Sequence, residues 1–208
     1  MRYEPARHHR RSIRLRGYDY SQAGAYFVTI CTQNRLCLFG KVLDGEMQPN
    51  DAGRMIEKWW LEMNCRFPTV ETDEYIVMPN HFHGIVVIVR ADLRACPDVM
   101  GVDDECCDNG GAHTGASLPS LIQWFKTMTT NEYIRRVKIS GWPPFVGKLW
   151  QRNYYEHIIR DEESLNRIRT YIGNNPLQWE LDRENPSLPL QKGQPHRAVS
   201  TGDEPWRD

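Results

Sequence analysis

The segment EYIVMPNHFHGIVVIV, residues 74–89, constrains the fold more than any other part of the chain. Its second half is a nearly continuous run of Ile and Val, which is typical of a buried β-strand. Two histidines stand at the start of this strand, separated only by Phe82. Because side chains alternate along a strand, His81 and His83 are expected to project from one face and Phe82 from the other.

The histidine pair is a candidate metal site. Alternate residues of a strand lie about 6–7 Å apart at Cα, so the two imidazoles can converge on one cation. Neutral imidazole nitrogens bind divalent metals at about 2 Å. Burying two polar rings beside Ile and Val is costly without partners, which favours a metal-binding role. A pair of structural histidines bonded to backbone or water is the alternative, and the strand supplies no third ligand.

The rest of the chain alternates between strand and helix signals. In chain order we expect a strand at 24–33, a hairpin at 35–50, a helix at 51–67 capped by Asp51, strands at 70–77 and 81–89, a helix at 117–138, a strand near 150–159 and a helix at 161–175. This order predicts the α+β class. The expected architecture is a ferredoxin-like or RRM-like sandwich, in which an antiparallel sheet carries the helices on one face.

Composition divides the chain into segments. We expect a basic arm at 1–16, one domain at 17–181 and a disordered, proline-containing tail at 182–208. The Gly- and Asp-rich stretch 90–116 has no periodicity and is predicted to be a flexible insertion within the domain. The six cysteines have no dense spacing, so reduced thiols are expected. Without a signal-peptide segment or an apolar run of about 20 residues, we expect a cytoplasmic protein with no membrane partner.

The net charge of −1 conceals two basic segments. Residues 1–16 contain six Arg and one Glu, and residues 117–160 contain seven Lys or Arg and two Glu. Segregated charge of this kind suggests a local surface that binds a polyanion, although a solvated face is the alternative.

The last predicted helix places polar side chains along one edge. In RIRTYIGNNP, Tyr171 and Asn175 are four residues apart and therefore lie on one face, with Arg167 one turn earlier. Read alone, this is a partly exposed tyrosine near an ordinary helix end, because Asn175 precedes Pro176.

Three motifs together carry a resemblance to a known family. VMPNHFHGIV, LWQRNYYEHIIRDEESL and YIGNNP, in this order and spacing, resemble the single-tyrosine HUH transposases, and most closely the REP-associated tyrosine transposases. The resemblance covers roughly residues 8–180. It implies that His81 and His83 bind a divalent metal, Mg²⁺ or Mn²⁺, with Asn175 as third ligand. It also implies that Tyr171 attacks a phosphate of single-stranded DNA, leaving a 5′-phosphotyrosine and a free 3′-OH.

The same resemblance implies that the enzyme nicks DNA and transfers strands at hairpins of REP-like palindromes. It allows a homodimer. The DNA acted on is expected to be nucleoid-associated. Tyr154 and Tyr155 are rival nucleophiles, but neither has an amide four residues later. Candidate DNA contacts are Arg10, Arg11, Arg14, Arg16, Lys126, Arg135, Arg136, Lys138, Trp150, Arg152 and Tyr154. Two other functions stay open: a non-catalytic nucleic-acid-binding module, and a metal-dependent hydrolase that uses water and forms no covalent adduct.

Overall fold

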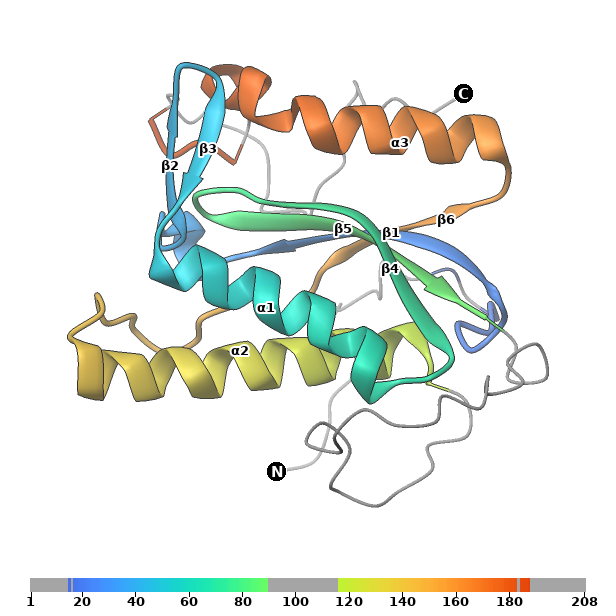
Figure 1. Ribbon diagram of the computed structural model, residues 1–208, viewed down its shortest axis with the longest axis horizontal. Helices are drawn as coiled ribbons and strands as arrows, with labels where there is room; N and C mark the ends of the chain where they lie inside the picture. The colour runs from blue at the N-terminus through green and yellow to red at the C-terminus, as the bar shows by residue number, and fades with distance from the viewer. Residues whose placement is uncertain (1–14, 16, 90–115, 183, 188–208) are drawn as a thin grey trace, which may run out of the picture.

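The computed structural model of the chain describes residues 15, 17–89, 116–182 and 184–187. Its main sheet is antiparallel, with the strand order β4-β5-β1-β6 (Figure 1). These strands are β1 (Gly24–Cys31), β4 (Val70–Val77), β5 (His81–Ile88) and β6 (Tyr155–Ile159). With the two helices between them, the chain order β1-α1-β4-β5-α2-β6 is the ferredoxin-like arrangement. The predicted α+β class and antiparallel sheet are confirmed.

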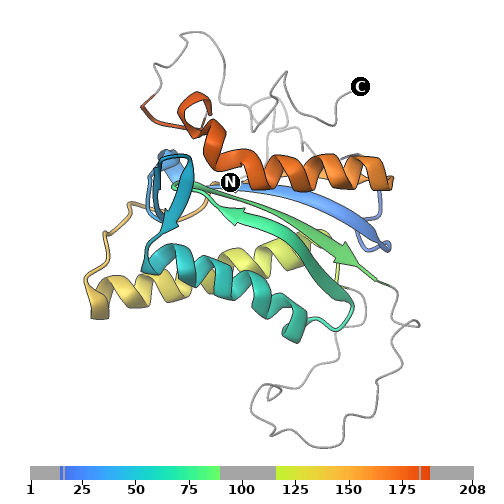
Figure 2. The same ribbon diagram turned by 45° about the horizontal axis from the view of Figure 1, so that its top comes forward.

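The helices cover both faces of this sheet. α1 (Asp51–Arg66) and α2 (Leu118–Ser140) pack on one face, and α3 (Glu162–Asn174) lies across the other, continuing into the short helix η3 (Asn175–Leu181) (Figures 1 and 2). The prediction that all helices share one face is therefore wrong for α3. The physical reason is a second apolar surface on the sheet, made by Phe27, Ile85 and Ile159, which α3 covers with its buried Ile168 and Ile172.

The face under α1 and α2 holds the larger core. Phe82 packs there against Trp60, with ring centroids 4.6 Å apart, and against Phe125 at 5.4 Å. Gly84, two residues along β5, is required by the same packing: a Cβ at this position would lie 2.5 Å from the Trp60 ring. The glycine of the HFHG sequence thus lets a tryptophan lie directly on the strand.

Local signals place the remaining elements. The hairpin of β2 (Gly40–Leu43) and β3 (Glu46–Pro49) turns at Asp44-Gly45, as expected, with positive φ at both residues. The N-cap of α1 is Asn50, whose side chain accepts from the Gly53 N–H, so Asp51 is the first helical residue and not the cap.

A short helix η1 (Gln33–Arg35) follows β1. Trp150 forms only an isolated bridge to Thr32, so β6 begins later than predicted.

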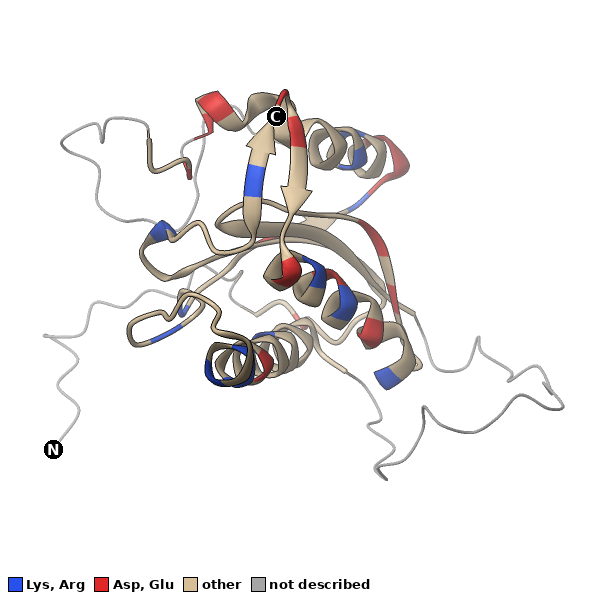
Figure 3. Ribbon diagram, turned by 60° about the vertical axis from the view of Figure 1, so that its left-hand side comes forward, with Lys and Arg blue, Asp and Glu red and all other residues tan. Residues whose placement is uncertain are grey.

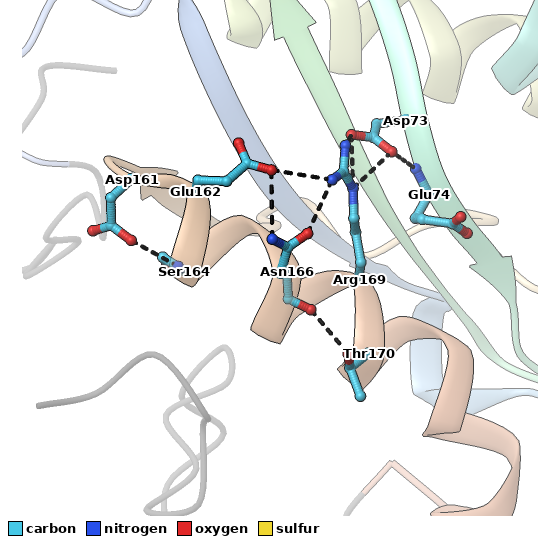
Figure 4. A network of polar contacts seen from close by, with 8 residues as sticks. All are labelled: Asp73, Glu74, Asp161, Glu162, Ser164, Asn166, Arg169 and Thr170. Carbon is cyan, nitrogen blue, oxygen red and sulfur yellow. Dashed lines mark hydrogen bonds and ion pairs between the residues drawn. The ribbon is translucent and has the colours of Figure 1, made fainter.

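A network of charges fixes α3 across the sheet (Figure 4). The Arg169 guanidinium contacts both carboxylate oxygens of Asp73 on β4, with an Nη2–Oδ2 distance of 2.6 Å. Asp161 caps the helix by accepting from the Ser164 N–H, as predicted. Because Arg169 is two residues before Tyr171, this contact helps set the position of the tyrosine over the sheet.

Several predicted segments lie outside the described residues: the arm with Arg10, Arg11, Arg14 and Arg16, the insertion up to residue 115, and residues 188–208. Beyond the predicted domain boundary at 181, Asp182 and residues 184–187 are described and contact the main fold. Within the described parts of the chain, no helix has the length and apolar character needed to cross a membrane.

Candidate active site

Strand β5 brings the two histidines under α3. In the sheet register, His83 pairs with Thr29 and His81 pairs with Cys31 on β1, so both imidazoles share the α3 face, as predicted. Their ring centroids are 4.6 Å apart and both rings are buried. The Thr29 hydroxyl lies 2.8 Å from His83 Nδ1, which leaves Nε2 as the nitrogen of that ring not held by the sheet.

The protonation of His81 is fixed by its neighbour Asn80. The Asn80 amide nitrogen donates to the backbone carbonyls of Glu184, at 2.6 Å, and Arg35, at 3.2 Å. Its Oδ1 therefore accepts, at 2.9 Å, from His81 Nδ1–H. A neutral imidazole has only one N–H, so His81 Nε2 carries a lone pair.

In the described part of the chain, no hydrogen-bond donor reaches that lone pair. His81 Nε2 and Asn175 Oδ1 are both buried, and neither has a hydrogen-bond partner among the described residues. Asn175 is a neighbour of the His81 ring, and the Asp182 carboxylate lies 3.7 Å from Nε2. Buried acceptors without donors are costly, and they are the kind of group that a bound cation satisfies.

Tyr171 completes the cluster from α3. Its ring centroid is 5.4 Å from that of His83 and 6.1 Å from that of Phe27, both in near-perpendicular contacts. One turn later, at the junction of α3 and η3, stands the buried Asn175. The i, i+4 spacing therefore places the tyrosine beside one histidine and the amide beside the other.

Burial keeps both imidazoles neutral. Removal from water lowers the pKa of His81, although the Asp182 carboxylate partly opposes this. Burial lowers the pKa of His83 well below its usual value, and the neighbouring His81 lowers it further. Burial likewise raises the pKa of the Cys31 thiol well above its usual value, so this cysteine remains a neutral neighbour of the site. Neutral imidazoles are the form that binds metal.

The donor set fits a divalent ion. No group of three or more His, Cys, Asp or Glu side chains suited to a metal occurs in the described residues. The set here instead combines two imidazoles with an amide oxygen, His81, His83 and Asn175, and it includes the two buried acceptors that have no hydrogen-bond partner among the described residues. Such mixed nitrogen and oxygen donors suit Mn²⁺ or Mg²⁺ when oxygen ligands are added from substrate or water.

The predicted DNA contacts separate into three groups. Trp150 and Tyr154 are buried in the core under α1 and α2, and the Trp150 indole donates to Thr129, so the structure corrects their role as base-stacking surfaces. The Lys126 ammonium contacts the backbone carbonyls of residues 151–153 and lies 5.2 Å from the Tyr154 ring, so it ties α2 to that segment. Exposed cations are Arg135, Arg136, Lys138 and Arg152, of which the first two pair with Glu132.

These cations lie on the α2 side of the sheet, whereas Tyr171 belongs to the α3 side. Figure 3 views the end of the molecule at which β5 begins, and shows basic residues on the exposed end of α2, one layer away from α3. Among the predicted contacts that the structure describes, these cations are therefore not gathered around the tyrosine. They lie beside one end of the sheet.

Sequence reasoning missed the residues that orient the histidines. Asn80 was visible directly before His81, and Thr29 could have been found once the register of β1 against β5 was known. Asp182 lay beyond the predicted domain boundary and gave no signal of its own.

No protein-family model matches the sequence. An uncharacterised protein of Haemophilus influenzae is 40% identical over 182 residues, covering 88% of this chain and 96% of that protein, so the two belong to one family. A second protein of that organism, named "Putative REP-associated tyrosine transposase", is 22% identical over 160 residues, covering 77% of this chain and 74% of that protein.

Among solved structures, a REP-associated tyrosine transposase bound to a REP hairpin aligns with a TM-score of 0.48 and 19% identity, covering 80% of this chain and 74% of that one. The similarity to the second Haemophilus protein agrees with the resemblance to REP-associated tyrosine transposases that the three sequence motifs indicate.

Proposed function

The chain is a relative of the REP-associated tyrosine transposases, and on that premise we propose that it is a metal-dependent DNA-nicking and strand-transferring enzyme. Its substrate would be single-stranded or hairpin DNA of REP-like palindromes. Tyr171 is the proposed nucleophile, and His81, His83 and Asn175 are the proposed metal ligands. The observation that carries this proposal is the contact of Tyr171 with His83, from segments far apart in the sequence, beside two buried acceptors that have no donor among the described residues.

The tyrosine supplies a reversible step. Its oxygen loses a proton and forms a bond to phosphorus while the bond from phosphorus to the 3′ oxygen breaks, and that oxygen takes up a proton. One phosphodiester is exchanged for another, so the released 3′-OH can attack the phosphotyrosine and rejoin DNA without ATP. The Phe27 ring, packed edge-to-face against Tyr171, restricts the angles from which the phenol can approach a strand.

The two histidines and the Asn175 amide form the proposed metal-binding part of the site. A divalent cation bound to them would act as a Lewis acid on the phosphate oxygens. Asn80 keeps the lone pair of His81 directed toward that position, and Thr29 holds the His83 ring. Thr29 lies on β1, and Asn80, in the turn before β5, is itself held by two backbone carbonyls, so both imidazoles are oriented before DNA arrives.

A single DNA strand can approach the site along the end of the sheet where β5 begins. The exposed Arg135, Arg136 and Lys138 near the end of α2 offer phosphate contacts there, and Arg152 follows on the loop before β6. Such contacts would fix the position of the strand without reading its sequence. A homodimer is compatible with this proposal and is not required by it.

The test is transfer of label from DNA to protein. A REP-like hairpin with a single-stranded flank is labelled at either end of the flank, incubated with the full chain and Mn²⁺, and resolved on a denaturing protein gel. We expect a covalent band with the wild type, and a loss of about 10³-fold or more with Tyr171→Phe. His81→Ala should also lose the band. The labelled end that stays on the protein identifies the polarity.

Tyr155→Phe is the matched control, because Tyr155 is in the same cluster and its ring centroid lies 6.4 Å from that of Phe27. It should retain the band. Cleavage without an adduct, surviving Tyr171→Phe, would identify a hydrolase. Binding without cleavage in every variant would identify a nucleic-acid-binding module. Loss of the adduct only in Tyr155→Phe would contradict the proposal and identify Tyr155 as the nucleophile.

A further inference from the structure

Asn80 is held by two segments that lie far from it in the chain. Its side-chain nitrogen donates to the carbonyl of Arg35, at 3.2 Å, and to the carbonyl of Glu184, at 2.6 Å. A carbonyl oxygen can only accept, so the amide nitrogen must face both carbonyls and the amide oxygen must face His81. Rotating the amide by half a turn would place its oxygen against two other oxygens. The two carbonyls therefore select one of the two orientations of the amide.

That orientation decides which nitrogen of His81 carries the proton. Because Asn80 Oδ1 lies 2.9 Å from Nδ1, the imidazole is protonated at Nδ1 and keeps its lone pair on Nε2. The reversed amide would present an N–H to Nδ1, and the proton would then have to be on Nε2. That competing form is within reach, since Asn175 Oδ1, a neighbour of the ring, could accept from an Nε2–H. The tautomer of His81 thus depends on where Arg35 and Glu184 place their carbonyls.

Arg35 has a backbone conformation that is unusual for its residue type. Its φ is 55° and that of the preceding Asn34 is 59°, so both residues are in the left-handed region. Asparagine adopts this region several times more often than other residues, whereas an arginine there is uncommon and costs free energy. Such conformations persist only where the surrounding structure fixes them, and they are concentrated at functional sites. In this loop the Arg35 carbonyl is directed at the Asn80 amide.

The side chain of Arg35 holds the segment that supplies the second carbonyl. Its guanidinium forms a two-pronged ion pair with the Glu184 carboxylate, with an Nε–Oε2 distance of 3.0 Å and an Nη2–Oε1 distance of 3.4 Å. The two side chains are only 33% and 16% exposed, so water screens this pair less than an ordinary surface pair. The Glu184 N–H also donates to Asp182 Oδ1, at 2.7 Å. Glu184 is therefore fixed by its side chain and by its backbone, with its carbonyl directed at Asn80.

We propose that Arg35 and Glu184 are positioning residues of the site. Their ion pair acts as a clamp on the Asn80 amide and, through it, on the tautomer of His81. The inference rests on the proposed function, in which the lone pair of His81 Nε2 binds the metal. Both residues act through Asn80 rather than on the DNA. The segment after η3, beyond the predicted domain boundary, thereby takes part in preparing the site.

The test is nitrogen-15 NMR of the histidine rings in the metal-free full chain, which distinguishes the Nδ1–H and Nε2–H forms of His81. Glu184→Gln keeps the shape of the side chain and breaks the ion pair. It should raise the ratio of the Nε2–H form to the Nδ1–H form by about threefold to fivefold.

Arg35→Gly keeps the test informative if Glu184→Gln folds poorly. Glycine adopts a positive φ as readily as a negative one, so this variant removes the guanidinium and retains the conformation of the loop. It should shift the tautomer ratio of His81 in the same direction and by a similar factor.

Asp73→Asn is the matched control. It breaks the ion pair with Arg169, whose two side chains are similarly shielded, at 36% and 22% exposed for arginine and aspartate, and which also joins distant segments. The tautomer ratio of His81 should be unchanged in this variant. A shift of equal size in the control would reduce the effect to a general loss of stability and overturn the clamp.

The direction of the shift separates the clamp from a direct effect of charge. Arg35 and Glu184 carry opposite charges, so removing each one would move the tautomer ratio in opposite directions if charge acted on the ring through space. The clamp predicts the same direction in both single variants and no further shift in the double variant. Opposite directions, or effects that add in the double variant, would overturn the proposal.

Failure of the clamp and failure of the proposed function can be told apart, because the NMR measurement needs neither metal nor DNA. If His81 keeps the wild-type tautomer ratio in Glu184→Gln and Arg35→Gly, the clamp is overturned and the proposed function stands. If the ratios shift as expected but the wild type forms no adduct with DNA and Mn²⁺, the clamp is supported and the proposed function is overturned.

Discussion

The two faces of the sheet differ in what their side chains do. Under α1 and α2, aromatic and aliphatic residues such as Trp60, Phe82 and Phe125 form one continuous apolar core. Under α3, the apolar cluster around Phe27 and Ile85 is smaller and stops at His81 and His83. The same strand, β5, contributes to both.

The difference shows how one strand serves stability and chemistry together. Phe82 points into the large core, and the histidine on each side of it points into the site. Alternation makes this division possible, because neighbouring residues face separate environments. The large core holds β5 in place, so the α3 face can contain buried polar atoms that have no hydrogen-bond partner among the described residues.

The largest effects are expected from substitutions of two neighbouring residues in β5, one of which should lower activity and the other stability. His83→Ala should reduce adduct formation by about 10²-fold or more, since a metal ligand is lost. In EDTA it should change the free energy of unfolding by only about 1 kcal/mol, for its bond to Thr29. Phe82→Ala should instead cost about 3–5 kcal/mol, because a buried ring leaves a cavity.

Urea denaturation and the adduct assay on the same two variants check the contrast. A His83→Ala protein that unfolds as readily as Phe82→Ala would mean that the site face also carries the stability of the fold.

The second prediction concerns the residue that orients His81. Asn80→Ala removes the acceptor for Nδ1–H, so the ring can also carry its proton on Nε2, and Mn²⁺ affinity should fall about 10–100-fold. Nitrogen-15 NMR of the metal-free protein should show His81 protonated at Nδ1 in the wild type and a mixture of tautomers in the variant. Unchanged ring-nitrogen shifts would show that Asn80 does not set the tautomer of His81.

A smaller effect is expected from the ion pair that holds α3. Arg169→Gln breaks the contact with Asp73, and because both side chains are partly exposed, the loss should be about 1 kcal/mol or less. Adduct formation should fall several-fold as Tyr171 loses its fixed position. Arg54→Gln, in the more exposed pair with Asp51 on α1, is the control and should change neither quantity. A double-mutant cycle with Asp73→Asn isolates the pair.

The smallest effect tests whether the α2 face takes part in DNA binding. Lys138→Ala should reduce the slope of log K against log salt by about 0.7 if its side chain neutralises one phosphate of a single strand. Lys58→Ala, on neighbouring α1, should leave the slope unchanged. Equal slopes in the wild type and both variants would restrict DNA contact to other parts of the chain.

Much of this fold could be predicted because the signals are local. The turn at Asp44-Gly45, the cap at Asp161 and the alternation of His81, Phe82 and His83 depend on a few adjacent residues. The placement of α3 could not be predicted in this way. Strands that are apolar on both sides allow a helix on either face, and periodicity does not tell which one a later helix will cover.

Stacking roles assigned from residue type failed for a related reason. Trp150 and Tyr154 have the rings that single-stranded DNA binds, yet both are buried, because aromatic residues are the largest contributors to a core as well. Only burial separates the two uses.

The sequence by itself determined the class of fold, the shared face of the two histidines and the i, i+4 pair of Tyr171 and Asn175, since each follows from the repeat of a strand or a helix. Only the tertiary structure decided that these two pairs meet, that Asn80 and Thr29 orient the imidazoles, and that Asp182 lies beside His81. Contacts between segments far apart in the chain depend on packing and register, which no local pattern encodes.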